Sequence, residues 1–115
     1  MIGILGTSDF SDYNQFVYIL NKIIQDAQLK GIKLTTPLPK EQYFGVSNLA
    51  IKYSESNSFP IQIYEEKKLI DGITKVLENS SIIILIHKNE IFVDYITNYA
   101  RKKNIPIFSF DLKLI

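Results

Sequence analysis

A run of five consecutive apolar residues at positions 82–86 most constrains what this chain can fold into. A strand with one solvent-facing side alternates apolar and polar residues, whereas a strand buried on both faces is continuously apolar. The run is far too short to cross a bilayer as a helix. We therefore expect an inner strand of a parallel sheet that carries helices on both faces.

Strand and helix patterns alternate along the whole sequence, as in the βαβ units of a parallel sheet. The expected strands are 2–6, 32–36, 61–64, 82–86 and 107–110. The expected helices are 13–29, a segment from between 44 and 47 to about 57, 67–77 and 90–103. Right-handed crossovers then give an α/β fold, a three-layer, doubly wound, mainly parallel sheet of five strands, in one domain over residues 1–115.

Individual residues mark several of these boundaries. Asp12 is the expected N-cap of the first helix, Gly31 is expected to end it, and Asn104 is expected to end the last one. Pro37 and Pro39 should lie in a loop, because proline has no N–H with which to continue a strand. The residues expected on the inner face of the first helix are Phe16, Val17, Leu20, Ile23, Ile24 and Ala27, and those of the second are Val46, Leu49, Ala50 and Tyr53.

Composition excludes several classes of function. The chain has no cysteine, which rules out a disulfide scaffold, a thiolate nucleophile and a zinc site built on thiolates. The net charge is only +1 and Arg101 is the sole arginine, which argues against nucleic-acid binding and against an arginine-clamped polyphosphate site. We expect a soluble, cytoplasmic protein without a metal, a cofactor or a membrane segment.

The first 13 residues form the first candidate ligand site, because they combine an apolar strand, a turn of small residues and a helix cap. Ligands of open α/β sheets bind at the carboxyl ends of the strands. Hydroxyl and backbone N–H groups of Thr7, Ser8 and Asp9 can hold a phosphate or a ribose there. The alternative explanation is ordinary capping of the first helix.

A second turn, after residues 82–86, meets the same edge of the predicted sheet. It contains His87, the only histidine, whose imidazole can contact a ligand, although a lone histidine at a strand end is more often a loop residue. Asn89 and Glu90 most simply cap the last helix, and Glu90, Asp9 and Asp12 are the carboxylates available for acid or base chemistry. No nucleophile lies beside a base by type and spacing, which favours binding over catalysis.

Three segments carry a family resemblance. The turn Gly6-Thr-Ser-Asp-Phe-Ser-Asp-Tyr13, the loop Gly45-Val-Ser-Asn-Leu-Ala50 and the turn that begins at His87 follow strands one, two and four in that order. They resemble the first turn, the phosphate-cradling loop and the later Gly-Gly-Thr turn of the SLOG superfamily, in particular its small stand-alone YAcAr-type members. In this chain Ser8 stands where the family has arginine, and Ser47 stands where it has an acidic residue.

The resemblance implies a Rossmann-like fold that binds a nucleotide or nucleotide-derived ligand at the carboxyl edge of the sheet. The ligand-binding residues that it implies are Gly6, Thr7, Ser8, Asp9, Phe10, Gly45, His87 and Asn89. It also implies a homodimer, formed through the second expected helix, which ends at about 57, or through the last one, at 90–103. One alternative is a hydrolase of nucleotide N-glycosidic or phosphoribosyl bonds, with Glu90, Asp9 or Asp12 as acid or base. Another is a protein-interaction module with a closed pocket. Tyr43 and Phe44 stand where the family has small glycines, and they either stack on a base, fill the emptied pocket or form a dimer contact.

Overall fold

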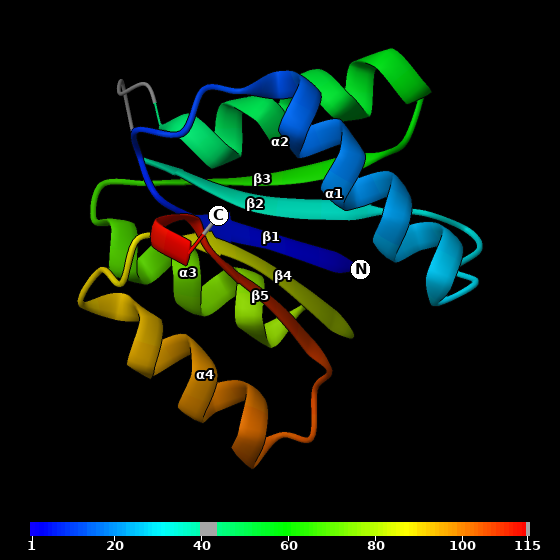
Figure 1. Ribbon diagram of the computed structural model, residues 1–115. Helices are drawn as coiled ribbons and strands as arrows, with labels where there is room; N and C mark the ends of the chain where they lie inside the picture. Colours follow the sequence, from blue (N-terminus) through cyan, green and yellow to red (C-terminus); the bar gives the residue numbers. More distant parts are fainter. Residues whose placement is uncertain (40–43, 115) are drawn as a thin grey trace.

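The computed structural model describes residues 1–39 and 44–114 and confirms the α/β fold (Figure 1). Among these residues, five strands form one all-parallel sheet, with α1 and α2 on one face and α3 and α4 on the other. The strands are β1 (Ile2–Gly6), β2 (Leu34–Pro39), β3 (Ile61–Glu66), β4 (Ile82–His87) and β5 (Ile107–Asp111). The helices are α1 (Tyr13–Asp26), α2 (Gly45–Asn57), α3 (Leu69–Glu78), α4 (Phe92–Lys102) and the short 3₁₀ helix η1 (Leu112–Leu114).

The strand order is β3-β2-β1-β4-β5, so β1 is the middle strand and all of its residues are buried. Along the chain, β2 and β3 are added on one side of β1. The chain then crosses back past β1, and β4 and β5 are added on its other side. The carboxyl ends of β1 and β4 therefore lie side by side at the topological switch point, where the strand order of the sheet reverses. In sheets of this kind a ligand binds at that point.

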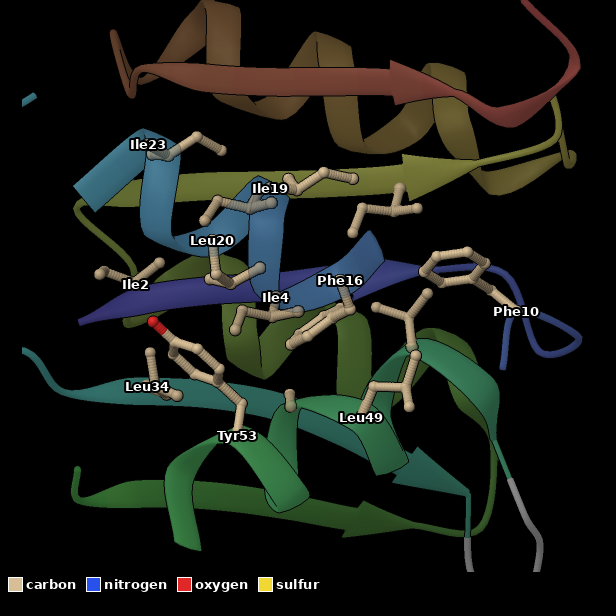
Figure 2. Close-up of a cluster of buried hydrophobic side chains, with 14 residues drawn as sticks. Ile2, Ile4, Phe10, Phe16, Ile19, Leu20, Ile23, Leu34, Leu49 and Tyr53 are labelled. Atoms are coloured by element: carbon tan, nitrogen blue, oxygen red, sulfur yellow. The ribbon is translucent and has the colours of Figure 1, made fainter. Parts of the chain in front are cut away.

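Two hydrophobic cores lie on the two faces of the sheet. Under α1 and α2, Phe16 and Tyr53 are almost completely buried and meet edge to face, with their ring centroids 6.0 Å apart (Figure 2). The continuous apolar run of β4 serves both cores, because Ile84 and Ile86 face α1 and α2 while Ile83 and Leu85 face α3 and α4. The expectation of an inner strand covered on both faces is confirmed.

Both prolines of β2 lie inside the strand, so the expectation of a loop there is wrong. The strand is paired with β3 over its whole length, including Pro37 and Pro39. The N–H of Leu34 donates to the carbonyl of Pro60, just before β3, and donors alternate between the two sides of a strand. The nitrogens of Pro37 and Pro39 therefore point toward β1, whose ladder with β2 ends at Thr35. The missing N–H groups cost no bond to β3.

A side chain replaces the backbone donor that Pro37 lacks. The β1–β2 ladder begins with the N–H of Ile2 donating to Lys33, and its continuation would place the nitrogen of residue 37 at the carbonyl of Ile4. The buried hydroxyl of Thr36 donates to that carbonyl instead, at 2.8 Å. The carbonyl of Ile4 is thus satisfied although the backbone ladder between β1 and β2 has ended.

The expected signals mark the start of α1 and the end of α4 but not the end of α1. The carboxylate of Asp12 accepts from the N–H of Gln15 at 3.0 Å and caps α1, as expected. Asn104, with a φ of 55°, follows the end of α4, also as expected. However, α1 ends at Asp26, so that Ala27 is exposed, and Gly31 lies in the later turn to β2.

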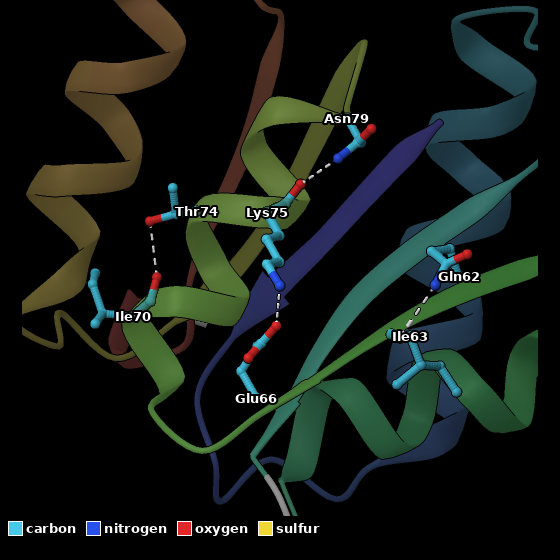
Figure 3. Close-up of polar contacts among 7 residues, drawn as sticks. All are labelled: Gln62, Ile63, Glu66, Ile70, Thr74, Lys75 and Asn79. Atoms are coloured by element: carbon cyan, nitrogen blue, oxygen red, sulfur yellow. Dashed lines mark hydrogen bonds and ion pairs between the residues drawn. The ribbon is translucent and has the colours of Figure 1, made fainter.

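One polar contact joins α3 to the end of β3, and another satisfies the end of α3 (Figure 3). The ammonium of Lys75 forms an ion pair with Glu66, and this carboxylate raises the pKa of Lys75. The side chain of Asn79 donates to the carbonyl of Lys75 at 2.8 Å and so satisfies one acceptor at the helix end. Across residues 1–39 and 44–114, the helices are all too short or too polar to cross a membrane.

Candidate functional site

The turns after β1 and β4 emerge side by side at the carboxyl edge of the sheet. The two strands pair in register from Ile2 with Ile82 to Gly6 with Ile86. The N–H of Thr7 continues this pairing by donating to the carbonyl of Ile86 at 2.9 Å. The fold thus brings the two candidate segments together, as the sequence predicts.

An ion pair joins the two turns. The ammonium of Lys88 lies 3.0 Å from one carboxylate oxygen of Asp9, and the hydroxyl of Thr7 donates to the other at 2.8 Å. The Asp9 side chain is 63% exposed and the Lys88 side chain 40% exposed. Both charged groups therefore remain accessible to a ligand from solvent.

The same contacts hold the pKa of the Asp9 carboxyl below its usual range, first through the Thr7 hydroxyl and then through Lys88. A depressed folded-state pKa gives stability that is present above the unfolded-state value of about 3.9 and is lost as the pH falls through the folded-state value. We expect Thr7→Val and Lys88→Ala each to raise the pKa of Asp9, as measured by carbon NMR titration of the carboxyl. Ser8→Ala is the control, since the exposed hydroxyl of Ser8 makes no bond to Asp9 within the described part of the chain. An unchanged pKa in both variants would contradict the assigned contacts.

His87 is buried and both of its ring nitrogens have partners. The N–H of Asn89 donates to Nδ1 at 3.0 Å, so the network places the ring proton on Nε2, which lies 2.9 Å from the hydroxyl of Ser109 on β5. Asn89 has a φ of 61°, and its side-chain amide donates to Asp111 at 2.8 Å. His87 and Asn89 therefore fasten the β4 turn to β5, and the imidazole presents no unpaired nitrogen to the edge.

The remaining carboxylates of the two turns also have local partners. Glu90 accepts from the N–H of Lys88 at 2.8 Å, and Asp12 caps α1. The expectation that Asn89 and Glu90 cap the last helix is wrong. Their side chains turn to Asp111 and to the backbone of Lys88, and α4 begins later, at Phe92, without a side-chain cap.

The two glycines of the candidate site allow close approach of backbones. A Cβ on Gly6 would lie 2.0 Å from the carbonyl oxygen of Ile86, and one on Gly45 would lie 2.7 Å from that of Ser8. The N–H of Gly45 donates to that same Ser8 carbonyl at 2.8 Å, and the N–H of Val46 donates to the carbonyl of Thr7 at 3.2 Å. These first amides of α2, which the family resemblance assigns to phosphate, are bonded to the first turn.

Aromatic residues near this edge belong partly to the core. Phe10 is 7% exposed and packs in the core under α1 and α2, and Phe44 is 8% exposed. Tyr43 lies outside the described residues. Ser8 is exposed on the first turn. Of the expected ligand residues, the ones whose side chains face solvent are thus Ser8, Asp9 and Asn89.

Comparisons with known proteins do not assign a function to this chain. No family model, curated protein or solved structure matches the chain. Within the described ranges, no three His, Cys, Asp or Glu side chains gather as metal ligands do.

Lys88, Ser109 and Asp111 take part in the edge network but were not predicted from the sequence. Lys88 follows His87 directly, so its place in the turn was a usable signal. Ser109 and Asp111 lie 22 residues from their partners His87 and Asn89, and only the pairing of β4 with β5 brings them into contact.

Proposed function

We propose that the carboxyl edge binds a nucleotide or a nucleotide-derived molecule at Asp9 and Lys88. The observation that carries the proposal is the exposed ion pair between these residues, which lies at the topological switch point of the sheet. A lysine ammonium binds phosphate oxygens as a point charge, and an ionised carboxylate accepts hydrogen bonds from ribose hydroxyls. The two neighbouring charges match the two parts of such a ligand.

The ligand is held in this proposal by side chains and not by a glycine-rich cradle. The amides of Gly45 and Val46 already donate to the first turn. The ion pair is exposed to solvent, and exposed pairs contribute little to stability, so a ligand can take over its charges at little cost. Ser8 adds an exposed hydroxyl beside Asp9.

Binding is favoured over catalysis because the groups suited to proton transfer are engaged in the fold. Both nitrogens of His87 are bonded, Glu90 holds the backbone of its own turn, and Asp12 caps a helix. A general acid or base must reach the proton that it transfers. Asp9, held ionised by its partners, serves as an acceptor.

The test is a thermal-shift screen with nucleoside mono-, di- and triphosphates and ADP-ribose, followed by calorimetric titration of any hit. A ligand at about a hundred times its dissociation constant stabilises the folded state by about 2.7 kcal/mol, which is a readily measured shift. We expect Lys88→Ala to weaken binding about tenfold, as loss of one charge-assisted contact does. Lys102→Ala, at the exposed end of α4, is the matched control. No shift across the panel, or equal binding by both variants, would refute the proposal.

A further inference from the structure

An apolar groove of about 190 Å³ lies between α1 and β5, on the face of the sheet that carries α1 and α2. Its floor is formed by Ile19 and Ile23 of α1 and by Phe108 and Phe110 of β5. On the other face of β5, Ile107 packs against the core under α3 and α4. In Figure 1, α1 and α2 lie on one side of the sheet and α4 lies beside β5 on the other.

The groove is open at the border of the molecule. β5 is the last strand of the sheet on this side, and Phe108 and Phe110 are only partly buried although they pack against the core under α1 and α2. Tyr18, at the rim of the groove, is 67% exposed. Exposed aromatic residues beside an apolar groove are typical of a protein interface.

The charged residues on the rim of the groove form a self-complementary pattern, so they can pair with the same residues of a second copy of the chain. Lys22 and Asp26 line it, one helical turn apart, with side chains 61% and 65% exposed. Their own contact, at 3.7 Å, is an exposed helical pair of little energetic weight. If two copies of α1 run antiparallel about a twofold axis near this turn, Lys22 of each copy faces Asp26 of the other. The rim charges can therefore pair with those of a second copy related by a twofold axis.

We propose that the groove binds a second copy of this chain, with α1 of each copy packed over β5 of the other. Tyr18 and the two phenylalanines form the apolar centre, and the rim charges pair across the twofold axis. This surface differs from α2 and α4, the helices through which the sequence led us to expect a dimer. It lies on a face of the sheet, away from Asp9 and Lys88 at its carboxyl edge, so the proposal is independent of the ligand site.

The test is light scattering and sedimentation of the purified chain over a wide range of concentrations. We expect a species of twice the 13.3 kDa chain mass. Lys22→Glu or Asp26→Lys alone replaces two attractive cross-contacts with repulsive ones and should raise the dimer dissociation constant about tenfold. The double variant restores opposite charges and should return the constant to near that of the unaltered chain. Lys102→Glu, which makes the same charge change on α4, should have no effect.

The charge changes are at exposed positions, so the variants should fold, and circular dichroism checks that they do. A monomer at every concentration would overturn the proposal. It would also be overturned by a dimer that both single reversals leave unchanged, or by single reversals that the double variant does not rescue.

Discussion

Gly6→Ala should lower the free energy of unfolding by about 4 kcal/mol or more, which is a large part of the roughly 5–15 kcal/mol that stabilises a typical domain. The added Cβ would lie 2.0 Å from the carbonyl oxygen of Ile86, and that carbonyl already accepts from the N–H of Thr7. The contact is with backbone in the middle of the sheet, so a rotamer change cannot relieve it. β1 and β4 would have to separate. Urea unfolding followed by circular dichroism measures the loss.

Gly31→Ala provides the matched control for this prediction. Nothing lies within 4 Å of the position of its Cβ, and only the left-handed φ of 61° opposes alanine there. The expected loss is about 1 kcal/mol, from backbone strain alone. Equal losses in the two variants would mean that loss of glycine flexibility, and not the contact with Ile86, governs position 6.

Valine substitutions at the neighbouring residues Thr36 and Thr35 should have different effects on stability, because only the Thr36 hydroxyl has hydrogen-bond partners. The hydroxyl of Thr36 donates to the carbonyl of Ile4 and shares a hydrogen bond of 3.0 Å with Ser47. Thr36→Val leaves both buried partners unsatisfied and should cost about 2–3 kcal/mol. Thr35→Val should be neutral or should stabilise by about 1 kcal/mol. Its Oγ1 is the single buried side-chain polar atom that lacks a partner in the described part of the chain.

The two threonines control for one another, because both are completely buried in the same strand and undergo the same change of shape. Chemical denaturation of both variants under identical conditions gives the difference directly. Similar losses in the two variants would show that packing of the side chain dominates. The bond that Thr36 makes in place of the missing N–H of Pro37 would then carry little energy.

The elements of this fold were predictable because their signals are local. The apolar run of β4, the cap at Asp12 and the inward residues of α2 each depend on side chains within a few positions of one another. The second strand was predicted to end too early for an equally clear reason. Whether a proline can lie in a strand depends on which neighbour its nitrogen faces, and the sequence does not show where the ladder to β1 ends.

The position of the candidate site could be predicted from the sequence, but the hydrogen bonds among its residues could not. The turns after the first and fourth strands were expected at one edge, and the structure places them there. The sequence suggested a helix cap for Asn89 and a ligand contact for His87. The structure gives both residues partners on β5. Those partners are chosen by strand pairing, which no local pattern encodes.

By itself, the sequence determined the number, order and type of the helices and strands, and hence a parallel sheet with helices on both faces. The periods of 2 and 3.6 residues and the capping rules act over a few positions. The tertiary structure alone decided which polar groups at the carboxyl edge remain accessible to solvent. The bonds that decide this span the chain, such as the pair of Asp9 with Lys88, which are 79 residues apart. Only the folded sheet brings such groups within hydrogen-bonding distance, and it leaves that pair accessible while it engages the amides of α2 and the imidazole of His87.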